Sequence, residues 1–143
     1  LHRIPDLANY MQMQEQVVES LLGEIKQATS CELDFIMMGG GLNTDSIADI
    51  CDKVEILTYT ADPKQVKKTI ESTVQRIGSA DQILTGYSVY GSATPDVDTL
   101  KQTVGIAVEA GVRNVSFYNY GIMPPTHLDW VRQAIQKMDE IIG

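Results

Sequence analysis

The sequence has few cysteines and no long apolar run. Its two cysteines, Cys31 and Cys51, show neither metal-ligand spacing nor a CxxC pattern, so we interpret them as structural thiols. Unpaired thiols weakly favour a reducing, cytoplasmic compartment. No apolar run reaches the roughly 18 residues of a membrane-spanning helix, so we predict no membrane partner. We find no signal-like segment either. Because the first residue is leucine, a fragment or a processed product is one interpretation.

The sequence is also short of positive charge. It has 11 basic and 19 acidic residues, which gives a net charge of −8. Nucleic-acid-binding proteins need clustered Lys and Arg, so we predict no nucleic-acid partner. Lys64, Lys67 and Lys68 do cluster, but Asp62 and Glu71 flank them, and a solvated helix face explains all five residues.

The chain is too short for a complete eight-stranded barrel, which takes about 250 residues. Its 143 residues suit one domain spanning 1–143. Apolar residues make up 43% and charged residues 21%, which is typical of a globular chain rather than a disordered one.

A repeated unit fills this length. Four times, a short apolar segment runs into tyrosine, glycine or small polar residues and then into an amphipathic helix. Another helix, near Asp6–Ala28, precedes them. Parallel strands connected by helices have this spacing. We therefore predict an α/β fold of four parallel βα units preceded by a helix, which is half of a TIM (β/α)8 barrel, with the strands in chain order and the helices on one side. The predicted strands are Leu33–Met38, Val54–Thr58, Gln82–Val89 and Val115–Tyr120.

Helix boundaries carry their own signals. Asp62 and Pro63 predict a capped helix start, Gly78 predicts its end, and Pro95 with Asp96 predicts the next start. Thr126 and Asp129 resemble a capping box before the last helix. The inward faces that we predict for the third and fifth helices are Val66, Ile70, Val74 and Ile77, and Leu128, Val131, Ile135 and Met138.

Tyrosines gather where the predicted strands end. In parallel βα folds, ligand sites form at the carboxyl ends of the strands. A tyrosine ring offers a flat apolar face and a hydroxyl, which suits the C–H faces and hydroxyls of a sugar. The alternative is that tyrosines are simply good strand residues that fill the barrel mouth. The ligand-binding candidates are Tyr59, Tyr87, Tyr90, Tyr118, Asn119 and Tyr120.

Gly39, Gly40 and Gly41 follow the first predicted strand and precede a helix. Backbone N–H groups in such a run can cradle an anion, although a tight turn is the simpler explanation. The run matches neither GxGxxG nor a P-loop.

Catalytic signals are sparse. Glu55 shares a strand face with Leu57 and Tyr59, so we expect it beneath the tyrosines, where a structural role is the simpler interpretation. His127 follows the last strand and could overhang the site, although capping or exposure explains it as well. Asp34 starts its strand, so we expect it at the amino end of the sheet, where residues of such barrels serve stability rather than catalysis. No metal cluster and no cofactor motif is evident.

Glycoside hydrolysis usually needs two carboxylates that flank the scissile bond. No Asp or Glu stands at the carboxyl end of any predicted strand, and helix capping explains Asp62, Asp96 and Asp98. We therefore expect no complete acid/base pair in this chain.

The stretch from Asp34 to Trp130 resembles the last four units of (β/α)8 barrels of the glycoside-hydrolase-like kind. The residues that carry the resemblance are Val54–Tyr59, Gly86–Ser88, Ala110–Gly121 and Leu128–Val131. In such proteins the general acid commonly follows the fourth strand of the barrel, which this chain would lack. The resemblance implies a carbohydrate-active or carbohydrate-binding segment with an incomplete active site.

Two other functions stay open. One is an assembly module, in which a twin chain forms a homodimer or a missing N-terminal half covers the sheet edges. The other is a small α/β protein that binds a phosphorylated ligand at Gly39–Gly41.

Overall fold

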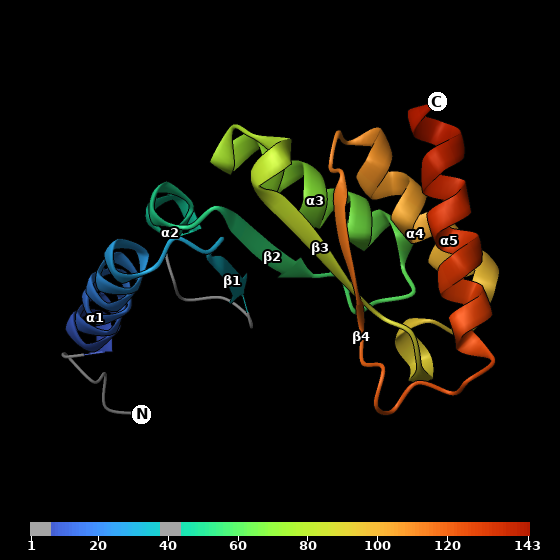
Figure 1. The fold of residues 1–143 in the computed structure, drawn as a ribbon, viewed down its shortest axis with the longest axis horizontal. Helices are drawn as coiled ribbons and strands as arrows, with labels where there is room; N and C mark the ends of the chain where they lie inside the picture. The colour runs from blue at the N-terminus through green and yellow to red at the C-terminus, as the bar shows by residue number, and fades with distance from the viewer. Residues whose placement is uncertain (1–6, 38–43) are drawn as a thin grey trace.

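A computed structural model describes residues 7–37 and 44–143. Helices and strands alternate along the chain, from α1 at one end of the molecule to α5 at the other (Figure 1). The elements are α1 (Leu7–Ala28), β1 (Asp34–Met37), α2 (Thr44–Ile50), β2 (Lys53–Leu57), α3 (Pro63–Ile77), η1 (Ala80–Gln82), β3 (Ile83–Ser88), η2 (Gly91–Ala93), α4 (Val97–Glu109), β4 (Asn114–Tyr118) and α5 (His127–Ile142).

The four strands form one parallel sheet in the order β1-β2-β3-β4. Ile36, Glu55, Leu84 and Asn114 stand side by side across it. The predicted α/β fold of four parallel βα units in chain order is therefore confirmed. Closure into half of a barrel stays a prediction. Within the described ranges, no helix is long and apolar enough to cross a membrane.

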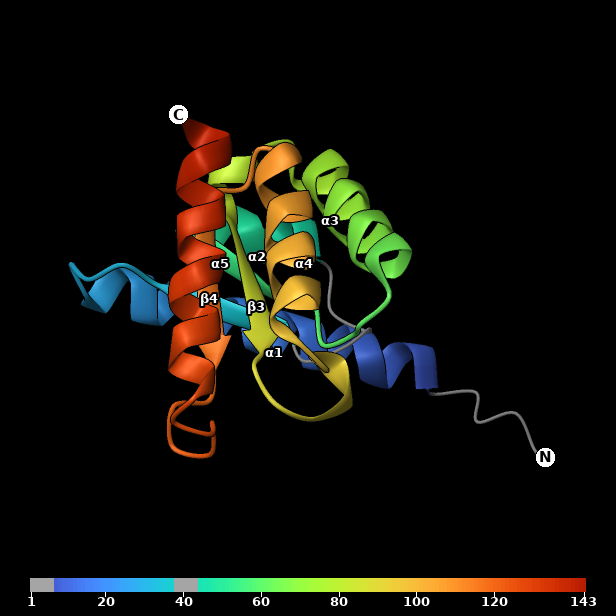
Figure 2. The ribbon, with the colours of Figure 1, turned by 90° about the vertical axis from the view of Figure 1, so that its right-hand side faces the viewer.

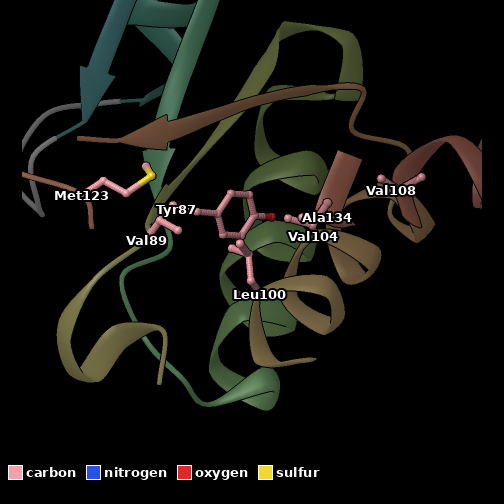
Figure 3. Close-up of a cluster of buried hydrophobic side chains, with 7 residues drawn as sticks. All are labelled: Tyr87, Val89, Leu100, Val104, Val108, Met123 and Ala134. Carbon is pink, nitrogen blue, oxygen red and sulfur yellow. The ribbon is translucent and has the colours of Figure 1, made fainter. Parts of the chain in front are cut away.

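The helices cover one face of the sheet. Figure 2 shows α3, α4 and α5 standing in front of the strands. Alternate strand residues, such as Val54, Ile56 and Ile83, point to this side and are buried among helix residues. The largest of these clusters lies between β3, α4 and α5 (Figure 3) and contains Tyr87, Val89, Leu100, Val104, Val108, Met123 and Ala134.

The residues between them point to the opposite face, which we call the open face. It carries Ile36 on β1, Glu55 and Leu57 on β2, Gly86 on β3, and Ser116 on β4. Ile36 is 49% exposed there, although it is apolar and lies in a strand. The described helices thus leave this face uncovered.

The predicted helix boundaries are largely confirmed. The Asp62 carboxylate accepts a hydrogen bond from the Lys64 N–H (2.9 Å), Pro63 opens α3, and Gly78 ends it with a left-handed φ of 77°. Asp96 caps α4 through the Thr99 N–H (2.8 Å). The capping box at Thr126 is wrong, because its side chain makes no cap bond.

The prediction for the inward face of α5 is partly wrong. Leu128 and Ile135 are 45% and 43% exposed, whereas Val131 and Met138 pack against the core. Helix α5 is the last helix of its layer and has α4 on one side only, so the apolar residues on its other side meet solvent. Ala134 is fully buried in their place, where α5 meets the rest of the core.

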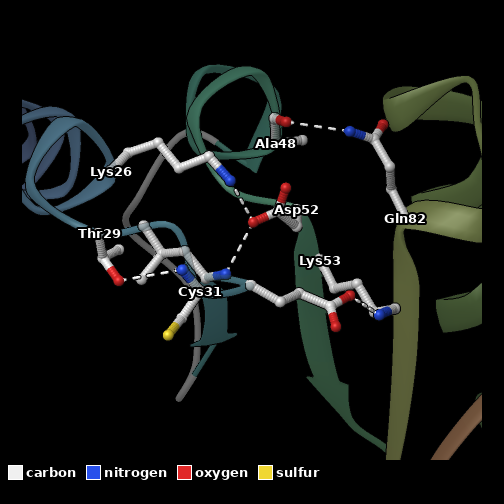
Figure 4. A network of polar contacts seen from close by, with 9 residues as sticks. Lys26, Thr29, Cys31, Ala48, Asp52, Lys53 and Gln82 are labelled. Atoms are coloured by element: carbon white, nitrogen blue, oxygen red, sulfur yellow. Dashed lines mark hydrogen bonds and ion pairs between the residues drawn. The ribbon is translucent and has the colours of Figure 1, made fainter.

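A polar network secures the amino ends of the first strands (Figure 4). The Asp52 carboxylate accepts hydrogen bonds from Lys26 of α1 and from the N–H of Leu33 (2.7 Å). These bonds lower the pKa of Asp52 below its ordinary value. Gln82 donates to the carbonyl of Ala48 (3.2 Å) and so joins η1 to α2. This end of the sheet is built for stability, opposite the end that carries the tyrosines.

Both cysteines are free thiols. Cys51 is buried, and burial raises the pKa of its thiol. Cys31 is exposed, so it does not belong to the core.

Candidate functional site

Two of the predicted tyrosines meet at the carboxyl end of the open face. The rings of Tyr59, after β2, and Tyr118, at the end of β4, have centroids 6.1 Å apart and are tilted by 32°. They are 39% and 50% exposed, which is high for aromatic residues that contact each other. Each ring thus keeps surface available to a ligand, as aromatic residues in sugar-binding sites must.

Glu55 lies beneath this tyrosine pair. It is two positions before Leu57 on the same face of β2 and four before Tyr59, which follows the strand, and only 8% of it is exposed. Its carboxylate accepts a hydrogen bond from the hydroxyl of Ser116 on β4. A carboxylate so close to solvent-exposed aromatic rings gives the site a polar, negatively charged floor.

Gly86 makes this floor possible. It stands on β3, between Leu57 of β2 and Ser116 of β4 in the register of the sheet. A Cβ atom at position 86 would lie 2.5 Å from Glu55 Oε1 and 3.3 Å from Ser116 Oγ. The missing side chain therefore opens the path by which Glu55 reaches Ser116 across a whole strand.

The same carboxylate affects the tyrosines above it. Burial and then the charge of Glu55 raise the pKa of Tyr59, and Tyr118 and Tyr90 contribute in the same direction. Tyr90 therefore lies within electrostatic range of Tyr59. The Tyr59 phenol stays protonated at neutral pH and keeps its hydrogen-bond donor.

Tyr87 does not belong to this group, and its placement corrects the prediction. Its neighbours Gly86 and Ser88 point to the open face, so Tyr87 points to the helices. It is 2% exposed, and its hydroxyl donates to the carbonyl of Thr103 on α4 (3.2 Å). Burial raises its pKa to about 12. Tyr87 is therefore a core residue (Figure 3).

Asn119 and Tyr120 follow Tyr118 in the loop to α5, and the Tyr118–Asn119 peptide is cis. The Asn119 side-chain oxygen accepts the N–H of Gly121 (2.9 Å), and its carbonyl accepts the N–H of Met123 (2.9 Å). Asn119 thus organises the turn. Tyr120 is 79% exposed and projects from it.

Gly39, Gly40 and Gly41, the predicted anion cradle, lie outside the described residues. His127 has a structural position. Its Nδ1 lies 2.6 Å from the carbonyl oxygen of Val89, and its ring stacks on Trp130 with centroids 3.7 Å apart. These contacts fix the start of α5 against the segment after β3.

Other carboxylates near the carboxyl ends are already engaged. Asp62 and Asp96 cap helices, and Asp98 pairs with Lys101. In the part of the chain that the structure describes, no group of three or more His, Cys, Asp or Glu residues could hold a metal ion. The arrangement can bind a ligand by stacking and hydrogen bonding, and it offers one carboxylate, Glu55, under the tyrosines.

Sequence reasoning missed Ser116 and Gly86. The available signal was a glycine inside a strand, which often marks a close approach of another group. Comparison with models of protein families, with curated proteins and with solved structures found no match to this chain. What this chain binds is therefore inferred from the geometry of the open face.

Proposed function

We propose that the open face binds carbohydrate at the carboxyl end of the sheet. The observation that carries this proposal is the partly exposed pair of Tyr59 and Tyr118, which follows the Glu55–Ser116 pair toward the carboxyl end of the sheet. Aromatic rings pack against the apolar C–H faces of a sugar. A carboxylate and a hydroxyl below them can bond the sugar hydroxyls, since such sites combine apolar walls with a few polar groups.

Titration of the purified chain with neutral mono- and disaccharides, followed by NMR chemical shifts, tests this proposal. We expect shift changes to centre on residues 55–60, 86–90 and 116–119. Replacing Tyr59 or Tyr118 with alanine should weaken binding at least tenfold. Gln75→Ala is the control, because Gln75 is exposed on α3, away from both edges of the sheet. Binding that is unchanged in both site variants would contradict the proposal.

The proposed activity of this chain is binding rather than hydrolysis. A glycosidase normally places two carboxyl groups on opposite sides of the scissile bond. Glu55 is held by Ser116, and the nearby Asp62 and Asp96 serve as caps. Hydrolysis would need a second carboxylate from the rest of a complete barrel.

Exposed apolar surface favours a second candidate function, assembly with a second copy of the chain. Strands β1 and β4 form the two edges of the described sheet. Apolar stripes flank both edges, on α1 (Tyr10, Met13, Val17 and Leu21) and on α5 (Leu128, Ile135 and Ile142).

Two such copies related by a two-fold axis could pair β4 of each with β1 of the other. This would make eight strands, a number that closes into a barrel, and it would cover both apolar stripes. The carbohydrate site would then lie in the mouth of the closed barrel, so the two proposals are compatible. Sedimentation of the purified chain tests this second proposal.

A further inference from the structure

We propose that Glu55 makes the site select uncharged, hydroxyl-rich ligands and reject anionic ones such as sugar phosphates and uronic acids. The inference rests on the carbohydrate-binding function proposed above and adds the charge class of the ligand. It starts from the position of a nearly buried carboxylate, 8% exposed, under the two tyrosine rings.

A bound ligand would approach the carboxylate from the tyrosine side, and only 8% of Glu55 is exposed to water that could screen the two charges. Interactions between charges are stronger in such a partly buried setting than in bulk water. A phosphate or carboxylate group on the ligand would be repelled there. A hydroxyl group, in contrast, can donate to Glu55, because Ser116 occupies only one of about four acceptor positions of a carboxylate.

The four described strands carry one basic residue, Lys53. Lys53 is the basic residue that shares this face of β2 with Glu55, and it is paired with Glu32 at the amino end of the strand. Arg113 precedes β4 at the same end and donates to the carbonyls of Val108 and Val112. Neither side chain stands beside the tyrosines.

Helix starts are the other usual places for an anion, because their free N–H groups point outward. The helices that follow β2 and β3 are α3 and α4, and both begin with an aspartate cap. The Asp62 and Asp96 carboxylates accept the Lys64 and Thr99 N–H groups at 2.9 and 2.8 Å. The chain thus fills these two positions with its own negative charges. At α5, which follows β4, Thr126 makes no cap bond, but Asp129 places a negative charge in the first turn.

The test compares matched neutral and anionic sugars. The probes are N-acetylglucosamine with its 6-phosphate, and galactose with galacturonate, each titrated against the purified chain by NMR at low ionic strength. We expect each neutral sugar to bind at least tenfold more tightly than its anionic partner. In E55Q the ratio of the affinity for the neutral sugar to that for its anionic partner should fall to threefold or less, mainly because the anionic sugars bind better. Glu109→Gln removes the same charge from an exposed position on α4 and should keep the wild-type ratio.

E55Q retains the size of the side chain and an oxygen that can accept from Ser116. A second measurement uses the wild-type chain alone. Added salt should reduce the preference for neutral over anionic sugars, because salt screens the repulsion between Glu55 and an anionic sugar. Equal affinity for neutral and anionic sugars would overturn the inference, and so would an affinity ratio that E55Q leaves unchanged. If sugar binding still depends on Tyr118 in that case, the carbohydrate site remains supported. If no probe binds to the wild-type chain, both proposals fail.

Discussion

The carboxylate of Glu55 on β2 accepts a hydrogen bond from the hydroxyl of Ser116 on β4, although β3 lies between these strands. The bond joins residues 61 positions apart and passes over Gly86. It therefore adds a side-chain link between β2 and β4 to the backbone pairing of the sheet. The same bond orients the only carboxylate that we assign to the candidate site.

Gly86→Ala tests this bridge. The new Cβ atom would lie 2.5 Å from Glu55 Oε1, so the carboxylate has to move and its bond to Ser116 is strained or lost. We expect the free energy of unfolding to fall by about 1–3 kcal/mol, measured by urea denaturation. Gly105→Ala on α4 is the control, since its Cβ would meet Ile141 at an ordinary 3.5 Å and alanine favours a helix. Equal stability of Gly86→Ala and wild type would contradict this account of the glycine.

Tyr87 should make the protein sensitive to alkali. Burial raises its pKa from 10.0 to about 12, so the unfolded chain loses this proton before the folded chain does. The protonated Tyr87 therefore contributes about 3 kcal/mol to the free energy of unfolding. This contribution is fully present below pH 10 and is lost as the pH rises through about 12. Tyr87→Phe should flatten this part of the pH profile of unfolding. Tyr120→Phe, at a 79% exposed position, should leave it unchanged.

Asp52 should make the stability of the folded chain sensitive to acid. Hydrogen bonds from Lys26 and from the Leu33 N–H lower its pKa in the folded chain. Its contribution is therefore present above the ordinary value of 3.8 and is lost as the pH falls through the lower, folded value. We expect Asp52→Asn to be less stable than wild type at pH 7, with the difference shrinking below pH 4 in thermal denaturation. Asp49→Asn, on the exposed side of α2, should not show such a pH-dependent difference.

Ile36→Lys tests assembly with a second copy. Ile36 is 49% exposed on the edge strand β1, so lysine can be placed there without disturbing the core. We expect the wild-type chain to sediment as a dimer at micromolar concentration and the variant to shift toward monomer, because charge protects an edge strand from pairing. Gln75→Lys on the exposed side of α3 adds the same charge away from both edges and should remain dimeric. A monomeric wild-type chain at this concentration would refute the assembly proposal.

The chain alone should not hydrolyse glycosides at an enzymatic rate. Glu55 stands under the tyrosines without a second carboxylate assigned to the opposite side of a bound sugar. Incubation with chromogenic glycosides should give no turnover above the uncatalysed rate. Turnover that is abolished by changing a single Asp or Glu would show that a catalytic pair exists.

The parallel sheet could be predicted because its signals are local. Each apolar segment is followed by its own helix, and caps such as Asp62 and Gly78 mark the boundaries. The outer face of α5 could not be predicted, because Leu128 and Ile135 fit the helical period as well as Val131 does. Only the position of α5 at the end of the layer decides which of them are buried.

The site was harder to predict than the fold. The β3 sequence, Ile-Leu-Thr-Gly-Tyr-Ser, shows no regular alternation of polar and apolar residues, so the face of Tyr87 could not be read from it. The bridge from Glu55 to Ser116 depends on the register of two pairings and on an empty position at Gly86. A single sequence shows each residue but not their alignment across three strands.

The strand order also determines how this chain can fold during synthesis. Every strand pairs with its neighbour in the chain, so each pairing closes only a short loop. Yet the largest buried cluster belongs to β3, α4 and α5, which leave the ribosome after α1, whereas α1 keeps Met13 and Val17 more than 60% exposed. On a nascent chain, α1 therefore presents exposed apolar residues before the sheet gains its largest core cluster, which forms only when β3, α4 and α5 have emerged.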